Sequence, residues 1–128
     1  PKADGTPYAT KKGAFRNHPS TKWAAETLYN TAWLIQHGCA LATEYYHRYG
    51  KIHTCTQTLF EAKKLFHRKT ELAIICHTQA KDFSRAMPDE WKFDATIDTF
   101  TAYKMYIASK PWVKDNYLRI PERKPEWV

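Results

Sequence analysis

The stretch KWAAETLYNTAWLIQHGCALATEYYHRYG, residues 22–50, decides the fold. Apolar or small side chains recur in it at every third or fourth position, and this spacing places them on one face of an α-helix. The stripe consists of Ala24, Leu28, Ala32, Ile35, Cys39, Ala42, Tyr46 and Tyr49. The pattern predicts one long helix from about Lys22 to Tyr49, with Gly50 as its left-handed C-terminal cap.

The opposite face of this helix carries a second stripe with the same spacing, in which polar side chains predominate. It consists of Glu26, Asn30, Trp33, His37, Leu41, Glu44 and Arg48. Glu44 and Arg48 stand four residues apart and can form an ion pair. Gly38, in the middle of the helix, costs about 1 kcal/mol of helix stability relative to alanine, and it allows a neighbouring helix to approach closely.

The segments around the long helix indicate an arm and a second helix. Residues 1–19 are rich in proline, glycine and polar residues, which predicts an extended arm, and Ser20 or Thr21 can cap the helix that follows. Thr58-Leu59-Phe60-Glu61 matches a capping box, so a short helix is expected from Thr58. The apolar run ELAIICH (71–77) fits either a strand or a buried helix, and the residues after it favour a helix.

The last third of the chain contains clear breaks. Met87-Pro88 ends the preceding helix, and DEWKFD (89–94) is typical of a loop or turn. Asp94 is expected to cap a helix over about 95–109, which Lys110-Pro111 ends. The tail, residues 111–128, is irregular, and we expect Trp112, Tyr117 and Trp127 to attach it to the body.

The prediction is a single, mainly α domain over residues 1–128, folded as a compact bundle of three to four helices with extended N- and C-terminal arms. The 128 residues suffice for one domain, and 43% hydrophobic with 26% charged residues argues against wholesale disorder. No run approaches the roughly 20 apolar residues of a membrane span, and no secretory signal pattern is present, so we expect no membrane partner. The net charge of +7 favours nucleic acid as a partner, although basic residues also serve solubility alone.

The cysteines and histidines do not form a recognisable metal or redox motif. The three cysteines, Cys39, Cys55 and Cys76, are an odd number without close spacing, which argues against a disulfide framework and for a reducing cytoplasm. The pairs His53/Cys55 and Cys76/His77 lack the spacing of zinc sites. Phosphate-loop, dinucleotide-binding and metalloprotease motifs are also missing from the sequence, so we expect neither a metal nor a cofactor.

The C-terminal end of the long helix is the first candidate site. An arginine held by a carboxylate is preorganised for phosphate, the helix C-terminus favours nearby cations, and tyrosines beside cations offer stacking faces for bases. The residues concerned are Glu44, Tyr45, Arg48, Lys51 and His53, with His37 two turns earlier on the same side. The alternative is a solvated ion pair beside ordinary charge complementation of a helix end.

Two further candidates lie upstream. Asn17, His18 and Lys22 surround the start of the helix, where free backbone amides bind anions, although simple capping also explains these residues. The secondary amine of Pro1 could act as a nucleophile toward an aldehydic carbon if it is the native N-terminus. Removal of an initiator methionine or a processed boundary explains the same residue without chemistry.

Several motifs taken together resemble a family of small bacteriophage-encoded proteins. They are NHPSTKW (17–23), EYYHRYGKIH (44–53), AMPDEWK (86–92), YKMYIASK (103–110) and RKPEW (123–127). The resemblance spans about residues 8–128. These proteins are in turn distantly similar to the phage pyrimidine-dimer DNA glycosylases, or endonuclease V-like proteins, which are small, basic and helical.

The resemblance implies a DNA-facing function. Members of the glycosylase group excise damaged bases and cleave the resulting abasic site, using an N-terminal amine and a glutamate from an N-terminal helix. This chain begins at Pro1 with a stretch that is expected to be extended, and that glutamate has no counterpart in it. Catalysis therefore does not carry over residue by residue, whereas the DNA partner agrees with the independent evidence of the charge.

We therefore expect a phage DNA-binding protein of the endonuclease V-like type, with base excision and abasic-site cleavage as its potential reaction, in the infected cell's cytoplasm or the virion. The candidate catalytic residues are Glu44, His53 and His18, and the candidate nucleic-acid-binding residues are Arg48, Lys51, Tyr45, Asn17, Lys22 and His37. Two alternatives stay open. One is a non-enzymatic viral accessory or virion protein that acts through protein contacts, and the other is a small enzyme acting on a nucleotide or phosphorylated substrate.

Overall fold

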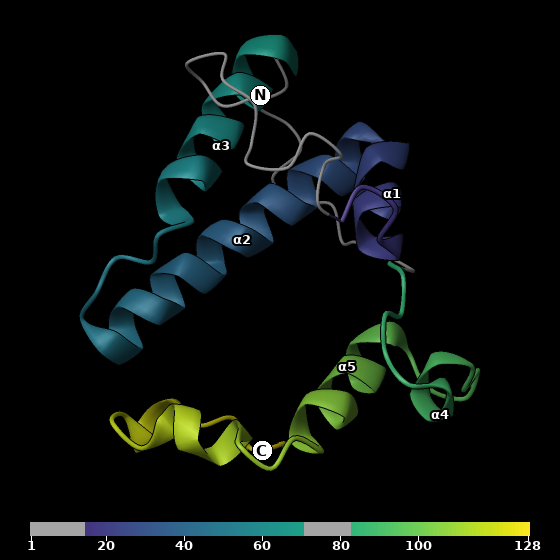
Figure 1. The fold of residues 1–128 in the computed structure, drawn as a ribbon, viewed down its shortest axis with the longest axis vertical. Coiled ribbons are helices and arrows are strands. Elements are labelled where there is room, and N and C mark those ends of the chain that lie inside the picture. Colours follow the sequence, from purple (N-terminus) through teal and green to yellow (C-terminus); the bar gives the residue numbers. More distant parts are fainter. Residues whose placement is uncertain (1–14, 71–82) are drawn as a thin grey trace.

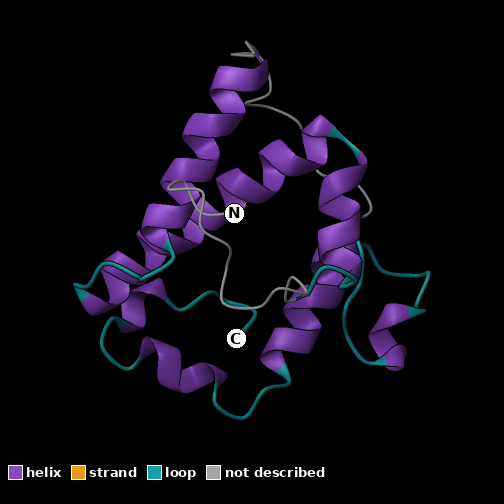
Figure 2. Ribbon diagram, turned by 45° about the horizontal axis from the view of Figure 1, so that its top comes forward, coloured by secondary structure: helices purple, strands orange, loops and turns teal. Residues whose placement is uncertain are grey.

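The computed structural model describes residues 15–70 and 83–128 (Figure 1), with the side chains of residues 68–70 left aside. Every regular element within these ranges is helical (Figure 2), which confirms the prediction of a mainly α fold. The α-helices are α1 (Pro19–Glu26), α2 (Leu28–Tyr49), α3 (Thr56–Thr70), α4 (Asp89–Lys92) and α5 (Thr99–Ala108), and two 3-10 helices follow, η2 (Val113–Tyr117) and η3 (Pro121–Arg123). Residues 1–14 of the arm predicted over 1–19, and the run 71–77, lie outside the described residues. The rest of the arm is not extended, because residues 15–18 form a turn and Pro19 begins α1, and residues 83–86, predicted to end the helix before Met87-Pro88, are not helical. None of the described helices is long and apolar enough to cross a membrane.

The prediction of one unbroken helix from Lys22 to Tyr49 is wrong, because the chain breaks at Thr27. This residue is extended, with φ −141° and ψ 156°, and its Oγ1 accepts a hydrogen bond of 3.0 Å from the backbone N–H of Asn30. The break lets α1 pack against α2, where the Asn30 side chain donates to the Trp23 carbonyl at 2.7 Å and Thr31 donates to the Ala24 carbonyl at 2.7 Å. Threonine is a good N-cap, so the local capping bond and the packing outweigh an uninterrupted helix.

The start of α1 also differs from the prediction of a Ser20 or Thr21 cap. His18 is the N-cap, and its Nδ1 accepts from the backbone N–H of Ser20 at 3.2 Å. Pro19 occupies the first helical position, where its fixed φ suits the helix and its missing N–H costs nothing. The His18 side chain is therefore occupied in capping the N-terminus of α1.

The turn from α2 into α3 confirms two predictions and corrects one. Gly50 is left-handed, with φ 62°, and its N–H donates to the Tyr46 carbonyl at 2.8 Å, as expected for the cap. Helix α3 packs against Gly38: a Cβ built there would lie 2.5 Å from Leu59 Cδ2. The predicted capping box is wrong, because α3 already begins at Thr56 and Glu61 accepts from the side chain of Gln57 instead.

The segment before α5 is more ordered than the predicted loop over residues 89–94. Pro88 precedes α4, a single helical turn. The guanidinium of Arg85 donates to the backbone carbonyls of Trp91, Asp94 and Ile97. One side chain therefore fixes the path of the connection into α5.

Helix α5 begins four residues later than predicted, and its cap is different. The carboxylate of Asp94 accepts from the backbone and hydroxyl of Thr96, which forms a local turn. Asp98 is the N-cap, and its Oδ1 accepts from the backbone N–H of Thr101 at 2.8 Å. Both aspartates suit a cap, and the path set by Arg85 leaves that role to the second.

The core is small and aromatic. Trp23 and Ala24 are buried, with Trp33 and Phe83 packed against them, and Phe83 also contacts Phe100 at a centroid separation of 5.2 Å. The predicted apolar stripe is only partly correct: Ala24 and Ala32 are buried, but Leu28 and Tyr46 are exposed. Of the three aromatic residues expected to attach the tail, only Tyr117 is buried, while Trp112 and Trp127 are exposed.

Candidate functional site

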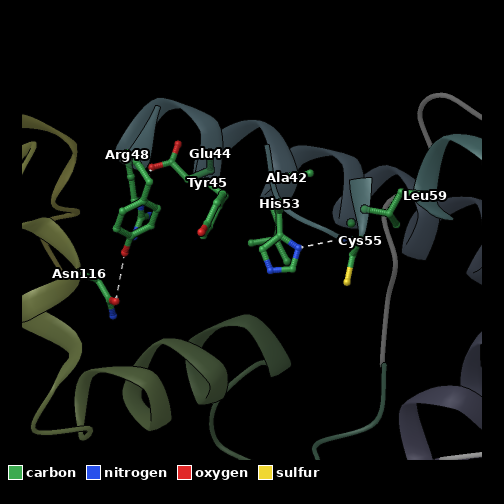
Figure 3. Close-up of a pocket in the computed structure, with 11 residues that line it drawn as sticks. Ala42, Glu44, Tyr45, Arg48, His53, Cys55, Leu59 and Asn116 are labelled. Atoms are coloured by element: carbon green, nitrogen blue, oxygen red, sulfur yellow. Dashed lines mark hydrogen bonds and ion pairs between the residues drawn. The ribbon is translucent and has the colours of Figure 1, made fainter. Parts of the chain in front are cut away.

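A pocket of about 470 Å³ lies along the second half of α2, toward its C-terminal end, and we call it the Glu44 pocket. Its polar and aromatic lining residues are Glu44, Tyr45, Arg48, Tyr49, His53 and Asn116. Figure 3 shows Tyr45, His53 and Cys55 pointing to the same side of α2. The structure thus brings together four of the sequence-predicted site residues: Glu44, Tyr45, Arg48 and His53.

Glu44 bridges two arginines from distant parts of the chain. Its Oε1 accepts from Arg48 Nε at 2.7 Å, and both its oxygens accept from Arg123 Nε at 3.1 Å. Arg123 Nη2 also donates to Oε2. The hydrogen bonds from Arg123 and from Arg48 lower the pKa of Glu44 from 4.5 to about 2. The carboxylate is therefore ionised near neutral pH, which suits it for holding arginines rather than for moving protons.

Arg48 is held on two sides. Glu44 engages its Nε, and its guanidinium carbon lies 4.4 Å from the centroid of the Tyr117 ring. The ring belongs to η2 and is buried, so it fixes the guanidinium plane. A guanidinium fixed by a carboxylate and an aromatic ring loses less side-chain entropy when its terminal nitrogens bind an anion.

The aromatic wall of the pocket consists of Tyr45 and Tyr49 with His53. The tyrosine ring centroids lie 4.7 Å apart, and His53 meets Tyr45 edge-on at 4.8 Å. Nδ1 of His53 accepts from the backbone N–H of Cys55 at 3.1 Å, so in the neutral ring the proton is on Nε2. The Tyr49 hydroxyl donates to Asn116 Oδ1 at 3.5 Å, which is a long hydrogen bond.

The other predicted site residues lie elsewhere. Asn17 is exposed before α1, Lys22 is exposed within α1, and His18 caps that helix. None of these three residues lines the Glu44 pocket, whose lining on α2 begins at Gly38. The two candidate sites are therefore separate.

Lys51 and His37 border the site without lining it. Lys51 is exposed directly after the Gly50 cap. His37 stacks on Trp33, with ring centroids 4.8 Å apart and an interplanar angle of 8°, and burial lowers its pKa from 6.5. His37 therefore favours its neutral form and serves the packing of α2.

Sequence reasoning missed the contribution of the tail. Asn116 lines the Glu44 pocket and Arg123 binds Glu44, in a contact that joins positions 79 residues apart. No local spacing encodes such a contact. The available signal was indirect: Tyr117 was expected to attach the tail to the body of the protein, without an indication of which helix it would contact.

The described residues, 15–70 and 83–128, include no group of three or more His, Cys, Asp or Glu side chains that could hold a metal ion. Cys39 and Cys55 are both free thiols. Arg, Tyr and His side chains around one ionised carboxylate thus supply the pocket's chemistry.

Comparison with known proteins adds no relative. A scan against protein-family models, a search of the curated proteins and a search of the solved structures each returned no match. The case for a function therefore rests on the geometry of the site and on the sequence motifs.

Proposed function

We propose that this chain binds DNA through the Glu44 pocket and the basic residues around it. The observation that carries the proposal is the bridge in which Glu44 holds Arg48 and Arg123 side by side. One carboxylate cancels one of the two positive charges and leaves a rigid cationic pair. Such pairs are typical of phosphate recognition, because their donors are oriented before the ligand arrives.

The charge around the pocket supports a polyanionic ligand. Arg119 lies with its guanidinium carbon 5.8 Å from the Tyr49 ring centroid, and Lys51 is exposed after the helix end. The helix dipole explains why cations gather here, since the C-terminus of α2 carries partial negative charge. A phosphate must accordingly bind side chains rather than backbone amides, which agrees with the arginine pair.

The aromatic wall supports a nucleic acid over a simple anion. Tyr45 and Tyr49 offer ring faces beside the cations, and base–aromatic stacking is worth about 1–3 kcal/mol per base. A volume of about 470 Å³ suits one small ligand or one nucleotide unit. The phosphates of neighbouring nucleotides would contact Arg48, Lys51 and Arg119.

Base excision is the reaction that we propose for this site, on the strength of the resemblance to the phage glycosylases. Glu44 is the positioning residue in this proposal, because its pKa of about 2 suits it poorly for proton transfer. His53, with Nε2 away from its backbone contact, is the candidate for moving a proton. Binding and reaction are tested separately.

Binding is tested by fluorescence anisotropy of a labelled duplex. We expect Arg48→Gln to weaken binding roughly tenfold, within the range for a partly buried charge-assisted contact. Arg16→Gln is the matched control, because Arg16 is exposed and precedes α1. No binding by the parent chain, or equal losses in both variants, would remove the Glu44 pocket from the proposal.

The reaction is tested by borohydride trapping on a duplex that contains one abasic site. A covalent protein–DNA adduct supports cleavage through an amine, whichever amine it involves. Retained DNA binding without an adduct would limit the function to binding. A chain that binds no DNA at all would instead fit the accessory-protein alternative, which acts through protein contacts.

A further inference from the structure

A second pocket, which we call the α2–α3 groove, lies between α2, the turn after it and α3. It has a volume of about 580 Å³. Its lining residues are Cys39, Ala42, Thr43, Tyr46, Ile52, Thr56, Leu59, Phe60 and Lys63. Ala42 and Leu59 also line the Glu44 pocket, so the two pockets lie on either side of the contact between α2 and α3.

The wall of the groove exposes large apolar side chains. Ile52 is 77% exposed, Phe60 58% and Tyr46 54%. Small side chains, Cys39, Ala42 and Thr43, lie beside them in the same groove. Within the described residues, sixteen large hydrophobic side chains are exposed, whereas Trp23, Val113 and Tyr117 are the buried ones. Contiguous exposed apolar surface of this kind marks an interaction site.

We propose that the α2–α3 groove binds the same groove of a second copy of this chain, in a two-fold symmetric dimer. Protruding apolar side chains and a hollow lie on one face, so each copy can insert Ile52 or Phe60 into the hollow of the other. A two-fold interface requires this self-complementarity, because the same patch serves both partners. The inference does not depend on DNA binding by the Glu44 pocket.

Charge makes the α2–α3 groove a more favourable contact between identical chains than the Glu44 pocket. Each copy carries a net charge of +7, so two copies repel each other wherever basic residues face. Among the described residues that line the groove, Lys63 is the one that carries a charge, and a lysine can keep its ammonium in water at the rim. A polyanion, in contrast, would find few cations in the groove.

The exposed area also matches what a dimer needs. Aromatic side chains carry about 150–250 Å² each, so the exposed parts of Tyr46 and Phe60 offer roughly 200 Å² per copy, and the exposed Ile52 raises this to roughly 300 Å². Interfaces are about 60% apolar, which implies roughly 1,000 Å² of buried surface for the pair. This is the lower bound for a specific interface, so we expect a dimer that dissociates on dilution.

Sedimentation velocity over about 1–300 µM protein, a range chosen for an interface of this size, tests the proposal. We expect the mass to rise from one chain to two with concentration. Phe60→Asp should raise the dissociation constant at least tenfold, because it places a carboxylate in the apolar contact. Leu118→Asp is the control: Leu118 is 74% exposed on the tail, outside the groove, and its variant should dimerise like the parent.

Circular dichroism confirms that each variant keeps its helices, and Ile52→Asp replaces Phe60→Asp if the latter unfolds. A monomer at all concentrations would overturn the proposal. So would a dimer that survives both groove variants, or one that Leu118→Asp weakens equally. If the groove instead binds a helix of another protein, the purified chain would be monomeric, and this result would also overturn the dimer proposal.

Discussion

Glu44 is the central charged residue of the Glu44 pocket, because it binds two arginines. Its side chain is 25% exposed and accepts hydrogen bonds from an arginine on its own helix and from Arg123 in the tail. Most surface ion pairs contribute little, but a carboxylate shared by two arginines in a partly covered position forms a small network. Glu44 therefore both orients Arg48 and joins η3 to α2.

Replacing Glu44 should reveal this role in the pH dependence of stability. The folded pKa of about 2 is below the unfolded value of 4.5, so the stabilisation is present above pH 4.5 and is lost as the pH falls toward about 2. We expect Glu44→Gln to lower the free energy of unfolding by about 1–2 kcal/mol at neutral pH. Urea unfolding of the parent chain and the variant between pH 7 and about pH 2 measures both the free energy of unfolding and its pH dependence. A parent chain and variant with parallel pH profiles would contradict the bridge.

His37 should act at higher pH. Burial lowers its folded pKa below 6.5, so the unfolded chain takes up a proton first and stability falls as the pH drops below 6.5. We expect His37→Gln to flatten the stability profile between about pH 7 and about pH 5. NMR titration of the His37 ring protons checks the same shift directly. A midpoint at or above 6.5 would contradict the partial burial of the His37 ring.

At the residue scale, the sequence predicts pairs on one helix and misses partners from elsewhere. Spacing of four residues sufficed for Glu44 and Arg48, and the left-handed cap at Gly50 followed from glycine chemistry. Arg123 could not be predicted, because a contact across 79 residues depends on how the tail folds back. Thr27 was missed because threonines also occur inside helices, so its preference for N-cap positions does not by itself mark a break in an apolar stripe.

At the scale of elements, α2 organises the described structure. Helix α1 packs on its first half, α3 packs at Gly38, and the tail contacts its C-terminal end. The apolar spacing predicted this helix well, but its breaks and caps depend on tertiary contacts. Asp94 and Asp98 are both suitable N-caps for α5, and the sequence does not choose between them. The backbone path that Arg85 fixes in the folded chain places Asp98 at the start of the helix.

Gly38 should be sensitive to size. A Cβ there meets Leu59 Cδ2 at 2.5 Å, so we expect Gly38→Val to separate α3 from α2 and to cost about 1–3 kcal/mol. Gly38→Ala should cost less, because the gain in helix propensity of about 1 kcal/mol offsets the shift of Leu59. Thermal unfolding of the two variants and of Gly38→Val/Leu59→Ala tests this. Failure of Leu59→Ala to relieve the valine would argue against the contact.

Arg85 should matter more than an ordinary surface arginine. It satisfies three backbone carbonyls over residues 91–97, so Arg85→Met should destabilise the chain by about 2–3 kcal/mol. Hydrogen exchange should increase in α4 and at the start of α5. Lys92→Met, at an exposed position in α4, is the control and should change neither the stability nor the hydrogen exchange. Unchanged exchange over 91–99 in the Arg85 variant would contradict its role.

At the scale of the whole molecule, the Glu44 pocket forms because the η2–η3 tail folds back onto α2. Residues from α2, from the turn that follows it and from the η2–η3 tail meet there, and Tyr117, Asn116 and Arg123 complete what α2 begins. The sequence predicted the half of the site that lies on α2 and just beyond it. The half that lies in the tail could not be predicted, because irregular segments carry no periodicity that places their side chains.

The salt dependence of DNA binding tests the central claim most directly. If Arg48 contacts phosphate, the logarithm of affinity should fall linearly with the logarithm of salt concentration, and Arg48→Gln should reduce the slope by about 1. Arg16→Gln, at an exposed position that does not line the Glu44 pocket, should leave the slope unchanged. A parent chain that does not bind, a flat salt dependence, or an Arg48→Gln slope equal to that of the parent would contradict the account.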